Sequence, residues 1–388
     1  MFFTLITFLI VLSILVFVHE LGHFLAARYF SVKAEEFGFG FPPRAIGFYK
    51  DFNGKWKKVR GNKEVRDAAD TIWSLNWIPL GGFVKIKGED GGNNDPDSFS
   101  TKKAWQRAII LLAGVTMNIL LAAVLFSFGF MIGLPQNLDN DFNPRAQITD
   151  KQIQVIQVLP NSPAQKAGVQ IGDIIKSINN IEFYNFNDLQ RYVREHINEE
   201  LEYKIIRGDK EIQLKIKPQI LSETEKGGIG VAIAEVGLVR YPFYIAFWEG
   251  IKSAIFLTWA IILAFYELLK NLIMGNGLNA EVAGPVGIAA LTGQMARMGI
   301  SYLIQFTALL SINLAIINAF PFPALDGGRL LFLVVEKIKG SPVKRELENT
   351  IHYIGFALLM LLVVVVTFKD VRHYVNFYNL WQNIKNLF

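Results

Sequence analysis

The chain has 388 residues, of which 52% are hydrophobic and 19% are charged, and its mean hydropathy is +0.30. These values indicate a polytopic membrane protein with a soluble part rather than a simple globular domain. The net charge of +5 gives no sign of nucleic-acid binding, and the absence of cysteine excludes disulfides and thiolate metal ligands. Any catalytic nucleophile must therefore be water or an oxygen-bearing side chain.

Residues 1–30 form an apolar run that predicts a first membrane span. The run lacks a basic start and a small-residue cleavage site, so we expect it to remain in the protein as a span. Near its end it contains His19-Glu20-Leu21-Gly22-His23. Residues four apart share one face of a helix, so His19 and His23 can ligate one zinc ion, with Glu20 beside them as general base.

The same five-residue motif also arises by chance in long sequences. Here the chain has only 5 histidines, and His19 and His23 have this spacing inside an apolar helix. Ionisable groups are costly at membrane depth and are rarely present there without a function. The setting therefore favours a metal site.

Residues 31–107 form a polar loop rich in lysine and arginine, which the positive-inside rule places in the cytoplasm. Within it, residues 72–87 alternate apolar and small residues around Gly81-Gly82, which predicts a β-hairpin. The hairpin could be an ordinary surface hairpin, or it could dip to the membrane surface and pair through an exposed edge with an extended substrate. The sequence favours neither alternative.

Residues 108–134 predict a second span, which returns the chain to the outside and carries Thr116 and Asn118. We interpret Asn118 as a helix–helix contact rather than a catalytic group. Residues 150–235 then change to a soluble, mixed α+β pattern. Residues 158–175 resemble the core of a bacterial PDZ domain, which binds extended peptides by adding a strand to a sheet edge. Gly228-Ile229-Gly230-Val231 is similar to the carboxylate-binding turn of such domains.

Residues 243–273 begin as an amphipathic pattern and contain only about eleven uninterrupted apolar residues, fewer than the roughly twenty needed to cross a bilayer. We expect this segment to be an interfacial amphipathic helix on the outer side, with Glu249 and Lys252 facing water. It would then add no crossing between the second and third spans.

Residues 301–329 predict a third span that ends in Asn318-Ala-Phe-Pro321-Phe-Pro323-Ala-Leu-Asp326-Gly-Gly. The two prolines break the helix, and the glycine pair allows a tight turn after Asp326. Irregular backbone at membrane depth is tolerated where it lines a wet cavity. Asp326 is therefore the candidate third zinc ligand, although a helix-capping role is the commoner fate of Asp-Gly-Gly.

Residues 351–368 predict a fourth span, which follows a second basic loop. Three ligands of one zinc ion must lie at one depth, so the third span must run in the same direction as the first. This requirement gives about four spans. The soluble domain lies outside the cytoplasm, and the active site lies toward the cytoplasmic side.

The histidine motif, the PDZ-like insert and residues 318–329 together resemble the bacterial site-2 proteases. These are intramembrane zinc metalloproteases that include the regulator-of-sigma-E protease. The resemblance covers nearly the whole chain. It implies that His19, His23 and Asp326 bind zinc and that Glu20 activates water to hydrolyse peptide bonds in or near transmembrane segments.

The resemblance also implies the fold and partners: a polytopic α-helical protein of a bacterial inner membrane, with an inserted PDZ domain and a membrane-associated β-hairpin at residues 72–87. Its substrates would be single-span membrane proteins, such as anti-sigma factors or signal-peptide remnants. Asn318 would hold the substrate chain, and the other candidate substrate-binding residues are Pro321, Pro323, Gly81 and Gly82. The better-known family member has tandem PDZ domains, whereas this chain has room for one.

Two other classes remain open from the sequence. A non-catalytic membrane scaffold that binds peptides through its PDZ domain would make Glu20 dispensable. A metal transporter would need several intramembrane His, Asp or Glu residues along a path through the spans, and the sequence has too few.

Overall fold

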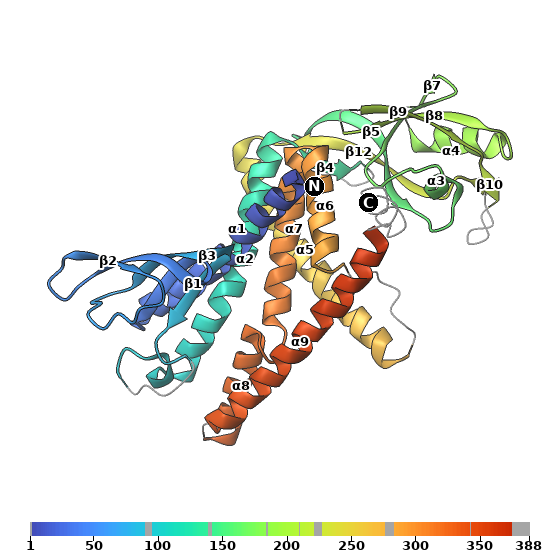
Figure 1. The fold of residues 1–388 in the computed structure, drawn as a ribbon. Coiled ribbons are helices and arrows are strands. Elements are labelled where there is room, and N and C mark those ends of the chain that lie inside the picture. The colour runs from blue at the N-terminus through green and yellow to red at the C-terminus, as the bar shows by residue number, and fades with distance from the viewer. Residues whose placement is uncertain are drawn as a thin grey trace, which may run out of the picture. The chain divides into compact units, whose positions relative to one another are not determined.

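The computed structural model describes residues 2–89, 95–138, 142–183, 185–208, 210–220, 227–275, 283–341 and 343–374. The chain divides into two units. The first comprises Met1–Val124, Lys252–Gln294 and Phe306–Phe388, and the second comprises Leu125–Ile251 and Met295–Gln305. Each unit is described by itself, and Figure 1 gives the element labels.

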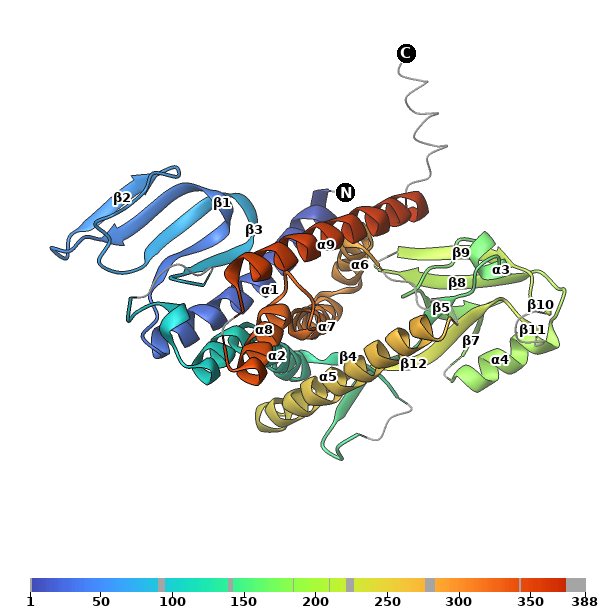
Figure 2. The ribbon, with the colours of Figure 1, turned by 90° about the horizontal axis from the view of Figure 1, so that it is seen from below.

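Long helices dominate the first unit. Five helices of the described chain are long and apolar enough to cross a membrane. They are α1 (Phe2–Tyr29), α2 (Ala104–Ile132), α5 (Phe243–Ile273), α7 (Ile300–Ala319) and α9 (Arg345–Tyr374). Two shorter helices, α6 (Pro285–Met298) and α8 (Asp326–Lys339), lie among them (Figure 2). The prediction of a polytopic helical membrane protein is therefore confirmed.

Small side chains let α1 and α2 approach closely in opposite directions. A Cβ on Gly22 would overlap the Ala113 carbonyl of α2. His23 lies beside Ile110, and His19 lies beside Asn118. Residues later in α1 thus contact residues earlier in α2, so the two helices are antiparallel, as expected for consecutive membrane spans.

The predicted interfacial segment is one helix of 31 residues, α5. These are the bounds expected from the sequence, and the helix continues through isolated polar side chains such as Glu267. By length and composition it could cross a membrane, and its predicted place at the interface stays a prediction. Its Phe265 ring lies 6.0 Å from that of Phe320. Phe320 directly follows the end of α7, so this part of α5 packs on the helical bundle.

The polar loop folds into a sheet of β1 (Ala34–Lys50), β2 (Trp56–Arg60) and β3 (Ile72–Ile86), in the order β2–β1–β3 (Figure 1). The predicted hairpin within residues 72–87 is wrong in its pairing, since both ends of β3 pair with β1. Alternation correctly predicted an extended segment. The alternation did not identify β1 as the partner strand, because the pattern of β1 is interrupted by Pro42 and Pro43.

The second unit holds a sheet in the order β4–β12–β5–β6–β8–β9, with β7 paired to β6. Two helices and a smaller strand pair complete it. The elements are β4 (Leu134–Asn137), β5 (Gln147–Val158), α3 (Pro163–Lys166), β6 (Ile174–Ile178), β7 (Ile181–Glu182), α4 (Phe186–Glu195), β8 (Leu201–Arg207), β9 (Lys210–Ile216), β10 (Gln219–Ile220), β11 (Gly227–Gly228) and β12 (Val231–Arg240). Buried Leu201, Tyr203 and Ile205 centre its core. The α+β pattern agrees with the sequence.

Candidate active site

The two histidines of α1 and the first residue of α8 bring three ligand atoms together. His19 Nε2 lies 3.0 Å and His23 Nε2 lies 3.3 Å from Asp326 Oδ2. The two imidazole Nε2 atoms are 3.2 Å apart. Both histidines are buried, and all three candidate ligand atoms lie within 4.8 Å of one another.

These separations fit zinc. Tetrahedral bonds of about 2.0–2.1 Å place two ligand atoms about 3.3 Å apart. The observed values are 3.0, 3.2 and 3.3 Å. Two imidazoles and one carboxylate leave the fourth position open, which is the donor set of a catalytic zinc site.

Backbone and side-chain contacts orient the imidazoles. His23 Nδ1 lies 2.8 Å from the Ile110 carbonyl, so Nδ1–H donates there and Nε2 keeps its lone pair for a metal. The Asn118 amide lies 3.3 Å from His19 Nδ1, and its Oδ1 is buried without a hydrogen-bond partner among the described residues. An amide rotated by 180° would place Oδ1 as acceptor for His19 Nδ1–H and satisfy both groups. This bond between α2 and α1 agrees with the sequence interpretation of Asn118 as a helix–helix contact, which did not name His19 as its partner.

The Glu20 carboxylate is held from β3. The Val84 N–H donates to Glu20 Oε2 at 3.1 Å. The bend of β3 also docks on α1: Ser13 Oγ donates to the Pro79 carbonyl and accepts from the Gly81 N–H, each at 3.2 Å. These contacts fix the strand edge beside the candidate general base.

Gly81 and Gly82 permit this docking. A Cβ on Gly81, whose φ is +71°, would overlap Val16 of α1, and one on Gly82 would lie 3.2 Å from the Phe17 ring. The end of β3 is anchored in turn by Lys87, which pairs with Asp95 at 2.7 Å and Asp97 at 2.6 Å. These two carboxylates raise the pKa of the Lys87 ammonium.

The Asp326-Gly327-Gly328 segment opens α8 instead of forming a turn after Asp326, which corrects the sequence interpretation. Leu325 is the N-cap residue and makes no side-chain cap, so Asp326 does not act as the capping residue. A Cβ on Gly327 would overlap the Ala319 carbonyl, and one on Gly328 would overlap the Phe322 carbonyl. The glycine pair lets the first turn of α8 close against the chain that leaves α7.

The other sequence candidates lie on this connecting segment. Asn318 is half-buried in the last turn of α7, and Pro321 and Pro323 follow it. Pro323 packs against Gly355 of α9, and the Ala324 N–H donates to His352 Nδ1 at 2.9 Å. Their predicted contacts with substrate stay predictions.

Gly114 of α2 was not singled out by the sequence. A Cβ there would overlap His23 Nε2 and lie 2.7 Å from His19 Cε1. We expect Gly114→Ala to displace both imidazoles and to weaken zinc affinity about 10- to 100-fold. Competition with a zinc chelator measures this. Thr116→Ala, at an exposed position of the same helix, is the matched control and should keep parental affinity. Equal affinity of the two variants would contradict this packing.

Comparison with known proteins shows the family of this chain. The profile of peptidase family M50 matches residues 7–59 and 62–362. The chain belongs to peptidase family M50. The resemblance to site-2 proteases is thereby confirmed, and this M50 chain is an intramembrane zinc metalloprotease of the type that acts in regulated intramembrane proteolysis.

Full-length relatives include a provisionally named zinc metalloprotease of Brucella suis, 34% identical over 95% of this chain and 94% of the relative. The regulator of sigma-W protease RasP of Bacillus subtilis is 30% identical over 95% of this chain and 98% of the relative. Among solved structures, a PDZ domain from Listeria monocytogenes is 23% identical, with a TM-score of 0.21, over 22% of this chain and 92% of the other.

Proposed function

We propose that His19, His23 and Asp326 hold the zinc ion of this M50 protease and that Glu20 is its general base. The convergence of three ligand atoms within 4.8 Å carries the proposal. Bound zinc in such a site acidifies water and polarises a peptide carbonyl. Glu20 takes a proton from the attacking water and delivers it to the leaving amine. The Val84 N–H holds the Glu20 carboxylate in place for both transfers.

The substrate chain is presented as an extended strand along β3. Val84 pairs with Phe37 of β1, yet its N–H is directed at Glu20. This part of β3 therefore has a backbone edge facing the candidate active site, where a substrate strand can add. Gly81 and Gly82 shape that edge. Asn318, Pro321 and Pro323, at the end of α7 and in the segment that follows it, are the other proposed contacts of the substrate chain. A peptide bond in a transmembrane helix must unwind before it can be cut, and strand pairing holds it open.

Removal of the metal tests the activity. We expect purified protein to cut a single-span reporter, to lose cutting when zinc is chelated and dialysed away, and to regain it when one equivalent of zinc is returned. Zinc content is measured in parallel by atomic spectrometry. Undiminished cutting by protein without zinc would contradict the proposal.

The soluble unit binds peptide and carries no chemistry. A cavity of about 290 Å³ lies between α4 and the start of β12, lined by apolar side chains and by Gly227 to Gly230. Val231 to Ala234 pair with β5 on one side. On the other side, within the described residues, Leu138 bonds to the Glu235 carbonyl and β4 pairs from Val236 on. The open edge and the glycine-rich turn suit an extended peptide in a PDZ-type groove. Deleting residues 153–218 should change which substrates are cut.

Single-span membrane proteins, such as anti-sigma factors or signal-peptide remnants, are the proposed substrates. The name of RasP ties that relative to sigma-W regulation, which supports this class for the M50 chain. The scaffold alternative makes Glu20 dispensable, and the assembled ligand set speaks against it.

The topology follows from the ligand set: we place the active site toward the cytoplasm and the soluble unit outside it. Gly355 of α9 packs on Pro323, and Asp370 of the same helix accepts from the Gly287 N–H at 2.7 Å. At about 1.5 Å per residue, Asp370 is about 22 Å further along α9. The start of α6 therefore lies at the opposite depth from the active site. This supports an even number of crossings between α2 and α7, whatever path α5 takes.

Single cysteines test this count, because the chain has none of its own. We expect Arg297→Cys, in the last turn of α6, and Lys166→Cys, in the soluble unit, to be labelled by an impermeant reagent from outside. Lys55→Cys, in the β1–β2 turn, should react only after the inner face is exposed. Labelling of Arg297→Cys only from inside would contradict the even count.

A further inference from the structure

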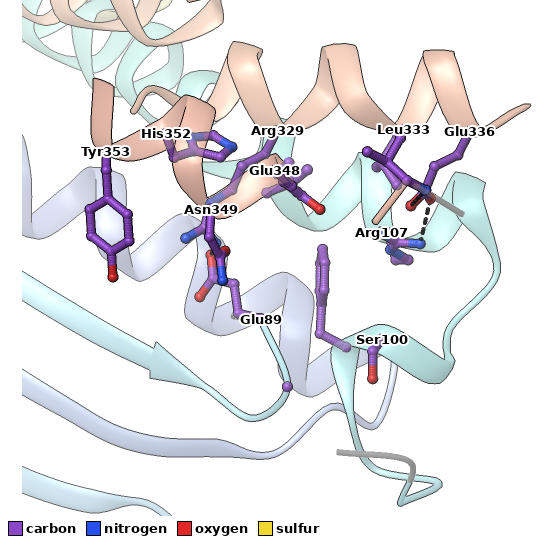
Figure 3. Close-up of a pocket in the computed structure, with 14 residues that line it drawn as sticks. Glu89, Ser100, Arg107, Arg329, Leu333, Glu336, Glu348, Asn349, His352 and Tyr353 are labelled. Carbon is purple, nitrogen blue, oxygen red and sulfur yellow. Dashed lines mark hydrogen bonds and ion pairs between the residues drawn. The ribbon is translucent and has the colours of Figure 1, made fainter. Parts of the chain in front are cut away.

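A polar cavity of about 380 Å³ lies between the loop after β3 and helices α2, α8 and α9 (Figure 3). Of the residues that the structure describes, five ionisable side chains line it besides His352 and Tyr353: Glu89, Arg107, Arg329, Glu336 and Glu348. Grooves along α1 are by contrast lined mainly by apolar side chains. The cavity therefore accepts polar or charged groups rather than lipid chains.

The cavity adjoins the candidate active site through α8 and α2. On α8, Asp326 faces the histidines, and Arg329, one helical turn later, lines the cavity. On α2, the Ile110 carbonyl orients His23, and the next residue, Leu111, lines the cavity.

Strand β3 and the loop that follows it also connect the candidate active site to the cavity. Val84 of β3 holds Glu20, and Glu89, in the loop that follows β3, forms an ion pair with Arg329 at the cavity wall. When a substrate is cleaved at the candidate active site around Glu20, one of the two new chain ends of the substrate therefore lies beside this cavity.

The charges of the cavity favour a cation. Arg329 pairs with Glu89, and Arg107 pairs with Glu336 at 3.1 Å. Together with Glu348 on α9, the described side chains that line the cavity comprise three carboxylates and two guanidinium groups, a net negative charge. Asn349, next to Glu348 on the same helix, offers a carbonyl oxygen, and Tyr353, further along the helix in Figure 3, offers an aromatic ring. Carboxylate, carbonyl and aromatic face all bind ammonium or guanidinium groups.

We propose that this cavity is a substrate subsite for a lysine or arginine side chain in the segment of the substrate that flanks the cut on the cytoplasmic side. The inference rests on the proposed function and on the proposed cytoplasmic location of the active site. Cytoplasmic flanks of membrane spans are rich in lysine and arginine. Glu348 therefore selects substrates whose basic flank directly follows the unwound segment.

Three reporters with one transmembrane segment and a cytoplasmic flank of two lysines, two glutamines or two glutamates test this subsite. Purified protein and reporters in detergent are used, so that the charges cannot alter membrane insertion. We expect the wild type to prefer the lysine reporter over the glutamate reporter about fivefold in kcat/KM, mainly through KM. Glu348→Arg should reverse this order. Glu346→Arg, at an exposed position of the same helix that does not line the cavity, should keep it.

Zinc content and thermal unfolding show whether each variant is folded. If Glu348→Arg does not fold, Glu348→Gln is measured instead and should bring the ratio close to one. Equal cutting of all three reporters by the wild type overturns the subsite and leaves the proposed function standing. An unchanged preference in a folded Glu348 variant also overturns it. Failure of the zinc-bound wild type to cut any reporter would instead contradict the proposed function.

Discussion

Replacing Glu20 by glutamine is expected to lower peptide-bond hydrolysis by about 10²- to 10⁴-fold, which is the usual contribution of a general acid–base group. Glutamine keeps the shape of the side chain and can still accept a hydrogen bond from the Val84 N–H, but it cannot take a proton from water. The ligand atoms of His19, His23 and Asp326 are unchanged. Zinc content should therefore stay at the parental level.

Single-turnover cleavage of a reporter measures the hydrolysis rate, and metal analysis of the same sample measures the zinc content. Glu64→Gln is the matched control, because the Glu64 side chain is 74% exposed on the polar loop. It should behave as the parent. A Glu20→Gln protein with near-normal turnover would refute the assignment of the base, and one without zinc would show that Glu20 is needed to hold the metal.

His23→Ala is expected to lose both zinc and activity. The change removes one of three protein ligands together with the bond from His23 Nδ1–H to the Ile110 carbonyl. Two remaining ligands do not form a closed protein site for zinc. Zinc per chain should fall to the background of a chelated sample, and cleavage should fall at least as far as in Glu20→Gln.

The matched control is His196→Ala. His196 ends α4 in the soluble unit, where its Nδ1 contacts the Tyr192 carbonyl at 2.8 Å. This variant should keep full zinc content and full cleavage of a reporter in detergent. Loss of zinc in both variants would point to general destabilisation rather than to a ligand role for His23.

The features of the site that depend only on residues close together in the sequence could be predicted from it. Helical spacing alone puts His19 and His23 on one face, and the break in the apolar pattern singles out Asp326. The sequence also predicted the α+β character of the soluble unit, because strand alternation and turn residues lie close together there.

The parts that depend on contacts between distant segments could not be predicted. The partner of β3 is β1, and its choice depends on how both strands pack beside α1. Gly114 and Asn118 act on the histidines only because α2 crosses α1 at that height. The interfacial placement of α5 stays a prediction, because a count of uninterrupted apolar residues stops at each polar side chain, whereas the helix continues through them and is long and apolar enough to cross a membrane.

The central claim is that His19, His23 and Asp326 bind one zinc ion. Zinc-edge X-ray absorption of the Glu20→Gln protein tests it most directly, because this variant should keep the metal and accumulate no product. We predict one zinc per chain with two imidazole nitrogens at about 2.0–2.1 Å and oxygen in the remaining positions. Protein that also carries His19→Ala should lose this zinc signal, because only two protein ligands remain. A spectrum with no imidazole, or one that His19→Ala leaves unchanged, would contradict the account.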